Sequence, residues 1–291
     1  MNFTTGLALL ELCQKESLSI GQVMLRREAA LARQTEDVLF QQMAGSYEIM
    51  KQSANGAFSP HPSPLGGFIG GESAKLNQYN QSCPPVCGPV VARAISYAMG
   101  VLEVNASMGL IVAAPTAGSS GVIPGVFLAV QEEFSLTDRE MTSALFAAGA
   151  VGYLITRNAT VAGAEGGCQA EVGSACAMAA AGVVQLMGGS PAQALDAASV
   201  AFANILGLVC DPIGGLVESP CQTRNAMGAS NALISAQIAL AGVAAQIPFD
   251  EMVQVMYSVG KSLPPSLRET ALGGMAAAPS ACSLCAGRCG K

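Results

Sequence analysis

Glu165–Gly182 reads EGGCQAEVGSACAMAAAG, and Cys210–Gly228 reads CDPIGGLVESPCQTRNAMG. These two segments place cysteines beside glycine, beside proline or at the expected end of a helix. Cys168 follows two glycines and opens an alanine-rich run that is typical of a buried helix. Cys210 begins a segment rich in proline and glycine, which we expect to end the preceding helix.

Cys221 is expected in the first turn of a helix that has Ser219 as its N-cap and Pro220 as its first residue. Unpaired N–H groups and the helix dipole at such a position favour a thiolate or an anionic cluster. Three cysteines at junctions of loops and helices, far apart in sequence, fit the ligands of an iron–sulfur cluster. The sequence therefore predicts that Cys168, Cys210 and Cys221 bind one cofactor.

Helix-start signals are spread along the chain. Capping boxes, in which Ser or Thr is followed three residues later by Glu or Gln, occur at Ser19–Gln22, Thr137–Glu140, Ser190–Gln193 and Ser266–Glu269. The first precedes apolar residues at helical spacing, which predicts one long helix up to Asn55. Strand signals are nearly absent. The expected fold is all-α, a compact single helical domain with a set of loops rich in glycine and proline.

The chain of 291 residues is long enough for one large domain. A loop rich in proline, glycine and serine spans residues 55–72 and is the best candidate for a boundary or a mobile lid. We therefore expect an N-terminal helical segment at 1–54, the main helical domain at 55–274 and a cysteine-rich tail at 275–291.

Composition excludes several classes of protein. Charged residues are only 12% of the chain and the net charge is −6, so no basic surface is expected for nucleic acid. So low a charge also indicates an apolar surface that contacts a partner.

Two uncharged runs, Asn105–Gln131 and Asn225–Phe249, reach the length of a membrane span. They contain prolines or polar side chains and lack flanking clusters of Lys or Arg, so both are interpreted as core helices. The N-terminus lacks the basic region of a signal peptide, which predicts a cytoplasmic protein without disulfides.

Seven further cysteines have weaker signals. Cys13 and Cys176 are interpreted as core residues. Cys83 and Cys87 form either a ligand pair or part of a packed loop. The tail cysteines belong either to a metal-binding tract or to a flexible reactive end, namely Cys282, Cys285 and Cys289. His61, the single histidine, is expected in solvent.

Several motifs resemble one enzyme family. They are Glu103-Val-Asn105-Ala-Ser-Met-Gly, Pro115-Thr-Ala-Gly-Ser-Ser-Gly121, Ala164-Glu-Gly-Gly-Cys168-Gln-Ala-Glu-Val-Gly and the segment from Cys210 to Asn225. Together they resemble the iron–sulfur L-serine dehydratases over about Gly70 to Gly274. The resemblance implies an oxygen-sensitive [4Fe–4S] enzyme that needs no PLP and converts L-serine to pyruvate and ammonia.

The resemblance also implies that Cys168, Cys210 and Cys221 are the cluster ligands. Three thiolates for four irons leave one iron open as a Lewis acid for the hydroxyl of serine. We expect a second set of residues to bind the substrate carboxylate and amine or the cluster sulfurs, namely Lys75, Asn105, Thr116, Ser119, Ser120, Arg224 and Asn225. For Lys75, a surface lysine at a helix start is an equally good interpretation.

The chain departs from this family in two respects. It lacks the Gly-Pro-Ser-Ser-Ser-His-Thr type motif that is thought to supply an active-site histidine. We therefore expect it to be the alpha subunit of a heterodimer whose beta subunit carries that motif. The tail after Gly274 also differs from that of single-chain relatives, and Cys282 is a candidate for a displaceable fourth ligand.

Two other functions remain open at this stage. The same scaffold would support elimination from threonine or another hydroxy acid, because discrimination of one methyl group is worth only about 1–3 kcal/mol. A cluster held entirely by thiolates would instead indicate a redox sensor or an electron-transfer protein.

Overall fold

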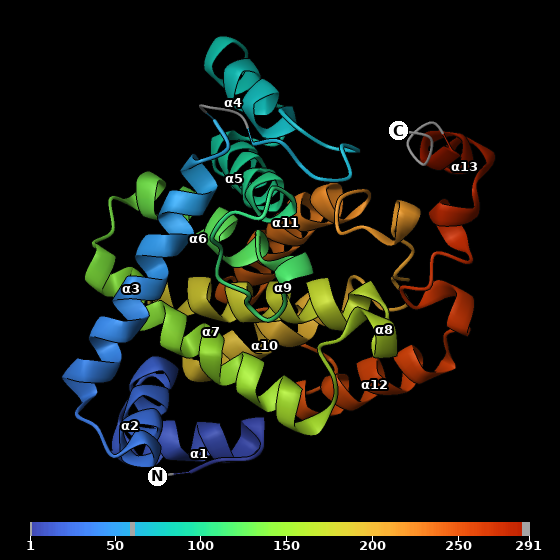
Figure 1. Cartoon of the computed structure of the whole chain (residues 1–291). Coiled ribbons are helices and arrows are strands. Elements are labelled where there is room, and N and C mark those ends of the chain that lie inside the picture. Colours follow the sequence, from blue (N-terminus) through green and yellow to red (C-terminus); the bar gives the residue numbers. More distant parts are fainter. Residues whose placement is uncertain (1, 59–61, 287–291) are drawn as a thin grey trace.

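The computed structural model describes residues 2–58 and 62–286, and it is all-α (Figure 1). His61 and Cys289 lie outside the described residues. The α-helices are α1 (Gly6–Glu16), α2 (Ile20–Ala32), α3 (Glu36–Asn55), α4 (Glu72–Ser82), α5 (Pro89–Ala106), α6 (Val122–Phe134), α7 (Asp138–Asn158), α8 (Gly163–Gly166), α9 (Cys168–Leu186), α10 (Pro191–Ala203), α11 (Cys221–Leu240), α12 (Phe249–Ser262) and α13 (Pro279–Ala286).

Four 3₁₀ turns complete the secondary structure of the described part. They are η1 (Ala117–Ser119), η2 (Ile213–Gly215), η3 (Pro265–Leu267) and η4 (Gly274–Ala277). A single parallel bridge joins Cys210 to Arg268, and no longer ladder occurs among the described residues. Within those residues, no helix has both the length and the apolar character needed to cross a membrane.

Helix α9 is the centre of the fold, and α6, α7, α10 and α11 pack around it (Figure 1). Most of its residues are buried, and alanine and glycine predominate among them. Small side chains allow neighbouring helices to approach closely. At Gly182, for example, an added Cβ would lie 2.5 Å from the Phe127 ring. Because other helices enclose α9, few of its residues are charged, and this contributes to the low charge of the chain.

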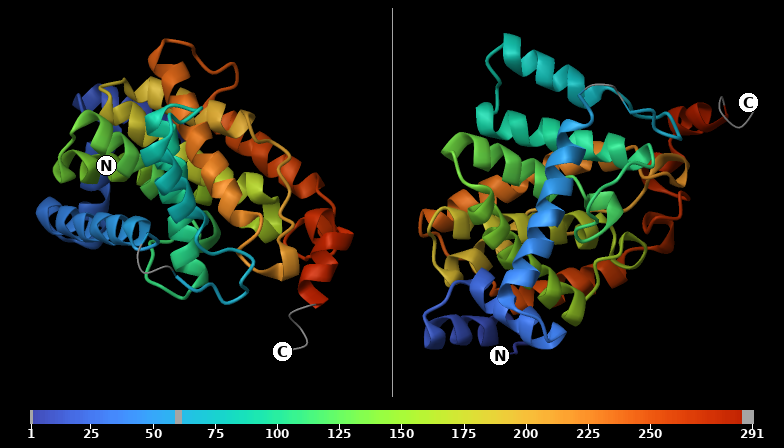
Figure 2. Two further views of the ribbon diagram at one scale, coloured as in Figure 1. Left: turned by 90° about the horizontal axis from the view of Figure 1, so that it is seen from above. Right: turned by 60° about the vertical axis from the view of Figure 1, so that its left-hand side comes forward.

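Helices α1 and α2 lie at one end of the molecule, and α4 lies at the opposite end, above α5 (Figure 2). The tail helix α13 lies at the side, against η2 and η4. Cys13 and Cys176 are buried, which confirms the interpretation of both as core residues.

Three of the four predicted capping boxes are confirmed. Those at Ser19, Thr137 and Ser190 make both reciprocal hydrogen bonds and begin α2, α7 and α10. The box at Ser266–Glu269 is wrong: the segment forms η3 and then leaves the helical region, with a φ of 62° at Glu269. Glu269 instead donates its backbone N–H to the carbonyl of Cys210 at 2.6 Å, and this tertiary contact determines its conformation.

Other predicted boundaries need correction. The single helix expected from Ser19 to Asn55 is two helices, because Arg33 is left-handed and Thr35 caps α3. Ser219 does not cap α11: Pro220 occupies the N-cap position and no side chain caps that end. The helix before Cys210 ends at Ala203, well before the Pro/Gly segment that was expected to end it.

Candidate functional site

Two of the three predicted cysteine ligands lie side by side. The sulfurs of Cys168 and Cys210 and a carboxylate oxygen of Glu171 all lie within 4.8 Å of one another. Cys168 is the first residue of α9, and Cys210 lies in the bridge to Arg268. Both cysteines are almost completely buried, at 1% and 2% exposure. Their thiols therefore form one site although they are 42 residues apart, as their numbers 168 and 210 show.

Cys221 is the third predicted ligand and lies in the first turn of α11, as expected, although the helix begins at Cys221 and not at Pro220. It is 5% exposed, and its sulfur is outside the tight group of Cys168, Glu171 and Cys210. Burial, followed by the negative charges of Cys168 and Glu171, raises the pKa of the Cys221 thiol to about 12. The three cysteines thus share one electrostatic environment at the N-terminal ends of α9 and α11.

The thiols of Cys168 and Cys210 shift each other's pKa. A hydrogen bond from the Cys210 thiol, with the charge of Arg224, lowers the pKa of Cys168. The same hydrogen bond, together with burial, holds the pKa of Cys210 far above its ordinary value. Because cysteine binds a metal as the thiolate, metal binding at this pair would be accompanied by loss of the Cys210 proton.

Arg224 supplies positive charge at this site. Its Nη1 contacts the Cys168 sulfur at 3.4 Å and donates to the Val209 carbonyl at 2.8 Å. Its Nη2 pairs with Asp211 at 2.6 Å, in an ion pair whose side chains are only 12% and 4% exposed. The guanidinium thus joins α11 to the start of α9 and to the loop around Cys210.

Two glycines leave room for the cysteines. Gly167 precedes α9 with a φ of 77°, a conformation that other residues rarely adopt. A Cβ at Gly163 would lie 3.0 Å from the Cys210 sulfur, so any side chain there would press on the site. The buried thiols of Cys168 and Cys210, with the carboxylate of Glu171 and one adjacent cation, form a group that could hold a metal.

The predicted substrate residues divide into two groups. Thr116, Ser119, Ser120 and Asn225 gather at the turn before α6, where the Oγ atoms of Thr116 and Ser119 are 2.9 Å apart. Asn225 is fully buried and binds only backbone groups, those of Gly118, Gly121 and Cys221. It therefore fastens α11 to this turn. Ser120 is likewise buried and donates to the Ala117 carbonyl at 2.7 Å.

Of the remaining predicted residues, Arg224 contacts Cys168, and Asn105 and Lys75 have weaker connections to the site. Asn105, at the end of α5, makes a long 3.4 Å hydrogen bond to the Ala117 carbonyl. Lys75 is exposed in the first turn of α4. That turn is fixed by Glu103, a fully buried carboxylate that accepts from Ser73 and, at 2.8 Å, from Gln222, the neighbour of Cys221. The described contacts thus link Lys75 to the site through α4, whose first turn Glu103 holds near Gln222.

Of the tail cysteines, the two that the structure describes are not part of the group of Cys168, Glu171 and Cys210. Cys282 is exposed, and its sulfur lies 4.0 Å from the carbonyl of Ala276. Cys285 is half-buried, with its sulfur 3.4 Å from where a Cβ of Gly214 would lie. Cys83 and Cys87 lie in the connection between α4 and α5, and Cys87 is exposed.

Sequence reasoning missed three acidic residues of this site: Glu171, Asp211 and Glu269. Glu171 had a local signal, because it follows Cys168 by three residues on one helix and thus shares its face. Asp211 and Glu269 had no such signal, because long-range contacts place them.

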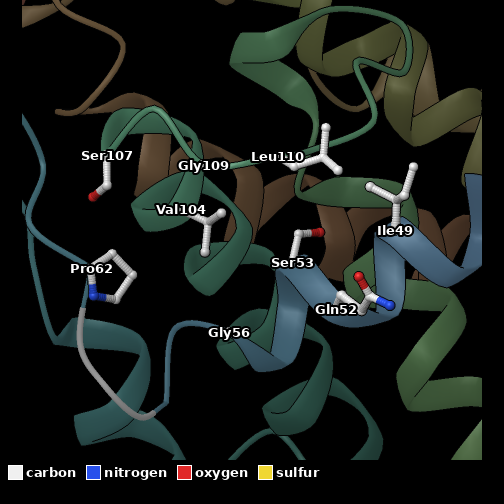
Figure 3. Close-up of a pocket in the computed structure, with 9 residues that line it drawn as sticks. All are labelled: Ile49, Gln52, Ser53, Gly56, Pro62, Val104, Ser107, Gly109 and Leu110. Atoms are coloured by element: carbon white, nitrogen blue, oxygen red, sulfur yellow. The ribbon is translucent and has the colours of Figure 1, made fainter.

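A separate cavity of about 320 Å³ lies between α3 and the end of α5 (Figure 3). Its walls include Ile49, Ser53, Pro62 and Val104, and none of the described residues that line it is acidic, basic or a thiol. These described residues supply no group for acid–base chemistry or metal binding.

Comparison with known proteins identifies the family. A family model described as "Serine dehydratase alpha chain" matches residues 15–276. The chain belongs to the serine dehydratase alpha chain family. The match includes every candidate cysteine of the buried site, and it ends before α13.

Named members of the family are similar over nearly the whole chain. "Probable L-serine dehydratase, alpha chain" of Bacillus subtilis (strain 168) is 45% identical, over 93% of this chain and 90% of the relative. "L-serine dehydratase, alpha chain" of Peptoniphilus asaccharolyticus is 43% identical, over 94% and 93%. "L-serine dehydratase TdcG" of Escherichia coli (strain K12) is 37% identical, but the match covers only 62% of that longer protein.

Proposed function

We propose that this chain is the alpha chain of an L-serine dehydratase, a lyase that converts L-serine to pyruvate and ammonia. The observation that carries the proposal is the buried group of Cys168 and Cys210 with Arg224, near Cys221, in a chain of this family. Buried thiols beside a cation are suited to bind a cofactor that carries out chemistry.

The proposed cofactor is a [4Fe–4S] cluster bound by Cys168, Cys210 and Cys221, with no PLP. When bound, such a cluster supplies a Lewis-acidic iron for the hydroxyl of serine. The chain itself supplies charge and shape. Arg224 offsets the negative charge of the thiolates through its contact with Cys168. Tight packing around α9 and α11 excludes water, which strengthens these electrostatic interactions.

The turn of Thr116 and Ser119 is the proposed wall for the substrate. Both hydroxyls lie at the start of α6, and Thr116 contacts Glu171. Ser120 and Asn225 are proposed to position this turn, since the structure shows both bound to backbone groups. Asn105 and Lys75 remain candidates for the substrate carboxylate, and each lies beside a segment that borders the site.

A beta chain is the proposed partner. The alpha-chain relatives match this chain over almost their full length, whereas E. coli TdcG is much longer. Exposed apolar side chains lie on the segments that border the site, and we call them the apolar rim: Leu65, Met108, Leu110, Leu216, Leu272 and Met275. Leu65 donates its N–H to Ala106, close to Met108, and Met275 donates to Asp211, next to Cys210.

The test is spectroscopic. The chain is purified without oxygen, its iron and sulfide are counted, and its absorption and EPR spectra are recorded before and after L-serine is added. We expect about four irons per chain and a spectrum that changes with serine. Cys168→Ala should lose the cluster. Cys176→Ala, which removes a buried thiol from the same helix, should retain it.

Absence of a cluster from the wild-type chain, or a cluster unaffected by Cys168→Ala, would disprove the proposed site. A complete cluster that ignores serine even with the beta chain present would instead support a redox role.

A further inference from the structure

Glu171 extends from the same helix face as Cys168, one turn further along α9. One of its carboxylate oxygens lies within 4.8 Å of the sulfurs of Cys168 and Cys210. Cys221, the third candidate ligand, is outside this tight group. A carboxylate is thus closer to the two thiols than the third cysteine is.

One oxygen of the Glu171 carboxylate is held by a hydrogen bond. Thr116 Oγ1 donates to Glu171 Oε1 at 2.5 Å. A Cβ at Gly118 would lie 2.5 Å from Oε1, so the absence of a side chain there makes room for the carboxylate. A Cβ at Gly163 would lie 3.2 Å from Oε2 and 3.0 Å from the Cys210 sulfur, so Oε2 and that sulfur face the same space. One oxygen is anchored, and the other is directed towards the thiols.

Glu171 has no ion-pair partner among residues 2–58 and 62–286. Arg224, the nearby cation, already pairs with Asp211 and contacts Cys168. Glu269 adds a further carboxylate, with its Oε2 3.5 Å from the same position beside Gly163. Burial and the nearby charge of Glu269 raise the pKa of Glu171, so either a proton or a bound cation relieves the repulsion at this site.

Among the described residues of the tail, neither cysteine occupies this space. Cys282 is exposed and its sulfur is near Ala276, while Cys285 faces Gly214. Within the described part of the chain, Glu171 is the carboxylate grouped with both thiols.

We propose that Glu171 is an oxygen ligand of the iron that Cys168, Cys210 and Cys221 leave without a thiolate. The inference rests on the proposed cluster. With a cluster bound, Glu171 Oε2 would be the oxygen available to this iron, and a serine hydroxyl would take its place. That exchange would break one iron–oxygen bond and form another, with no change in electron count. Thr116 retains the displaced carboxylate through Oε1.

The experiment uses the anaerobic chain loaded with ⁵⁷Fe and compares Glu171→Ala and Glu171→Gln with wild type by Mössbauer spectroscopy. The rate at which mild oxidation removes one iron from the cluster is measured in parallel. Glu165→Gln, an exposed carboxylate of α8, and Cys282→Ala are the matched controls.

In the wild-type chain we expect one iron with the signal of an oxygen ligand. In Glu171→Ala this signal should change and that iron should be lost at least about tenfold faster. Both controls should match wild type. Glu171→Gln keeps the shape of the side chain, so its change would separate ligation from a folding defect.

Identical spectra and loss rates in wild type and both Glu171 variants would overturn the inference while leaving the cluster proposal intact. A change in Cys282→Ala alone would assign the position to the tail and would also overturn it. Absence of a cluster from the wild-type chain would reject both the inference and the proposed function.

Discussion

Arg224 shows how much one residue contributes to this site. Its guanidinium contacts Cys168 Sγ, the Val209 carbonyl and Asp211 at once, and it does so from the first turns of α11. A planar fork with several donors can make all three contacts, whereas the single ammonium of a lysine cannot. Asp211 in turn accepts the N–H of Met275 at 2.7 Å, so the same ion pair helps to hold the segment that leads to α13.

We expect Arg224→Met to destabilise the cluster-free chain by about 3–5 kcal/mol, because it leaves the buried Asp211 carboxylate without its partner. The double variant Asp211→Asn/Arg224→Met should be more stable than Arg224→Met alone. Urea unfolding of wild type, both single variants and the double variant measures this difference. If the losses of unfolding free energy in Asp211→Asn and Arg224→Met simply add in the double variant, the two side chains do not stabilise one another.

At the scale of elements, short-range hydrogen bonds set the starts of the helices. The Ser190 hydroxyl accepts a hydrogen bond from the backbone N–H of Gln193. The side chain of Gln193 in turn accepts from the Ser190 N–H and donates to the Ala239 carbonyl of α11. The start of α10 is therefore fixed both locally and against its neighbour.

Ser190→Ala should lower the free energy of unfolding by about 1 kcal/mol, since it removes the side-chain oxygen that caps α10. Thermal unfolding followed by circular dichroism should show a decrease of about 2–4 °C in the midpoint. Ser258→Ala replaces an exposed hydroxyl in the middle of α12 and serves as the control. A midpoint for Ser190→Ala equal to that of the control would contradict the capping role.

The carboxylate of Asp138 joins two helices and makes a pH-dependent contribution to the free energy of unfolding. Its carboxylate accepts from Lys51 of α3 at 2.8 Å and from Gln131 of α6 at 2.7 Å. These hydrogen bonds lower its pKa. Because the pKa of Asp138 is lower in the folded chain, its stabilising contribution is fully present above the unfolded pKa of about 3.9. That contribution is lost as the pH falls through the folded pKa.

Asp138→Asn should therefore destabilise the chain at pH 7, and the difference from wild type should shrink once the pH falls below about 3.9. The effect should stay below about 1 kcal/mol, because the Asp138 side chain is 61% exposed. Urea unfolding at several pH values measures it. Asp37→Asn removes a carboxylate from the first turn of α3 and is the matched control. A difference that grew towards acid pH would have the wrong sign.

For the whole molecule, the distribution of exposed apolar side chains is informative. Leu7 and Leu31 are exposed on α1 and α2, at the end of the molecule away from α4 (Figure 2). The apolar rim instead follows the segments that border the cysteine site. Contact with a second chain would cover this surface and would also close the site to water.

Leu65→Glu/Leu272→Glu should weaken association with the coexpressed beta chain, because it places two charges in the proposed contact. The control, Leu7→Glu/Leu31→Glu, changes side chains of similar exposure, 64% and 62%, on the other helices. Copurification and sedimentation measure the association, and the iron content shows whether the site remains intact. Equal association of both variants would exclude the rim as the contact surface.

The features that the sequence predicted correctly are local. The all-α class, three of the four capping boxes, the helix start at Cys168 and the place of Cys221 in a first helical turn depend on residues within about four positions of one another. One failure has a local explanation and another does not. The left-handed Arg33 interrupts the expected long helix, whereas the hydrogen bond from Glu269 to Cys210, far away in sequence, accompanies the departure of Glu269 from the helical region.

Only the tertiary structure decided how the site is assembled. Cys168 lies beside Cys210 because α9 packs within a shell of helices while the bridge to Arg268 holds Cys210 against it. Asn225 fastens the turn at Gly118, more than 100 residues earlier, and Thr116 donates a hydrogen bond to Glu171, 55 residues later in the chain. Such contacts depend on how whole helices pack, and no pattern within a few residues records that packing.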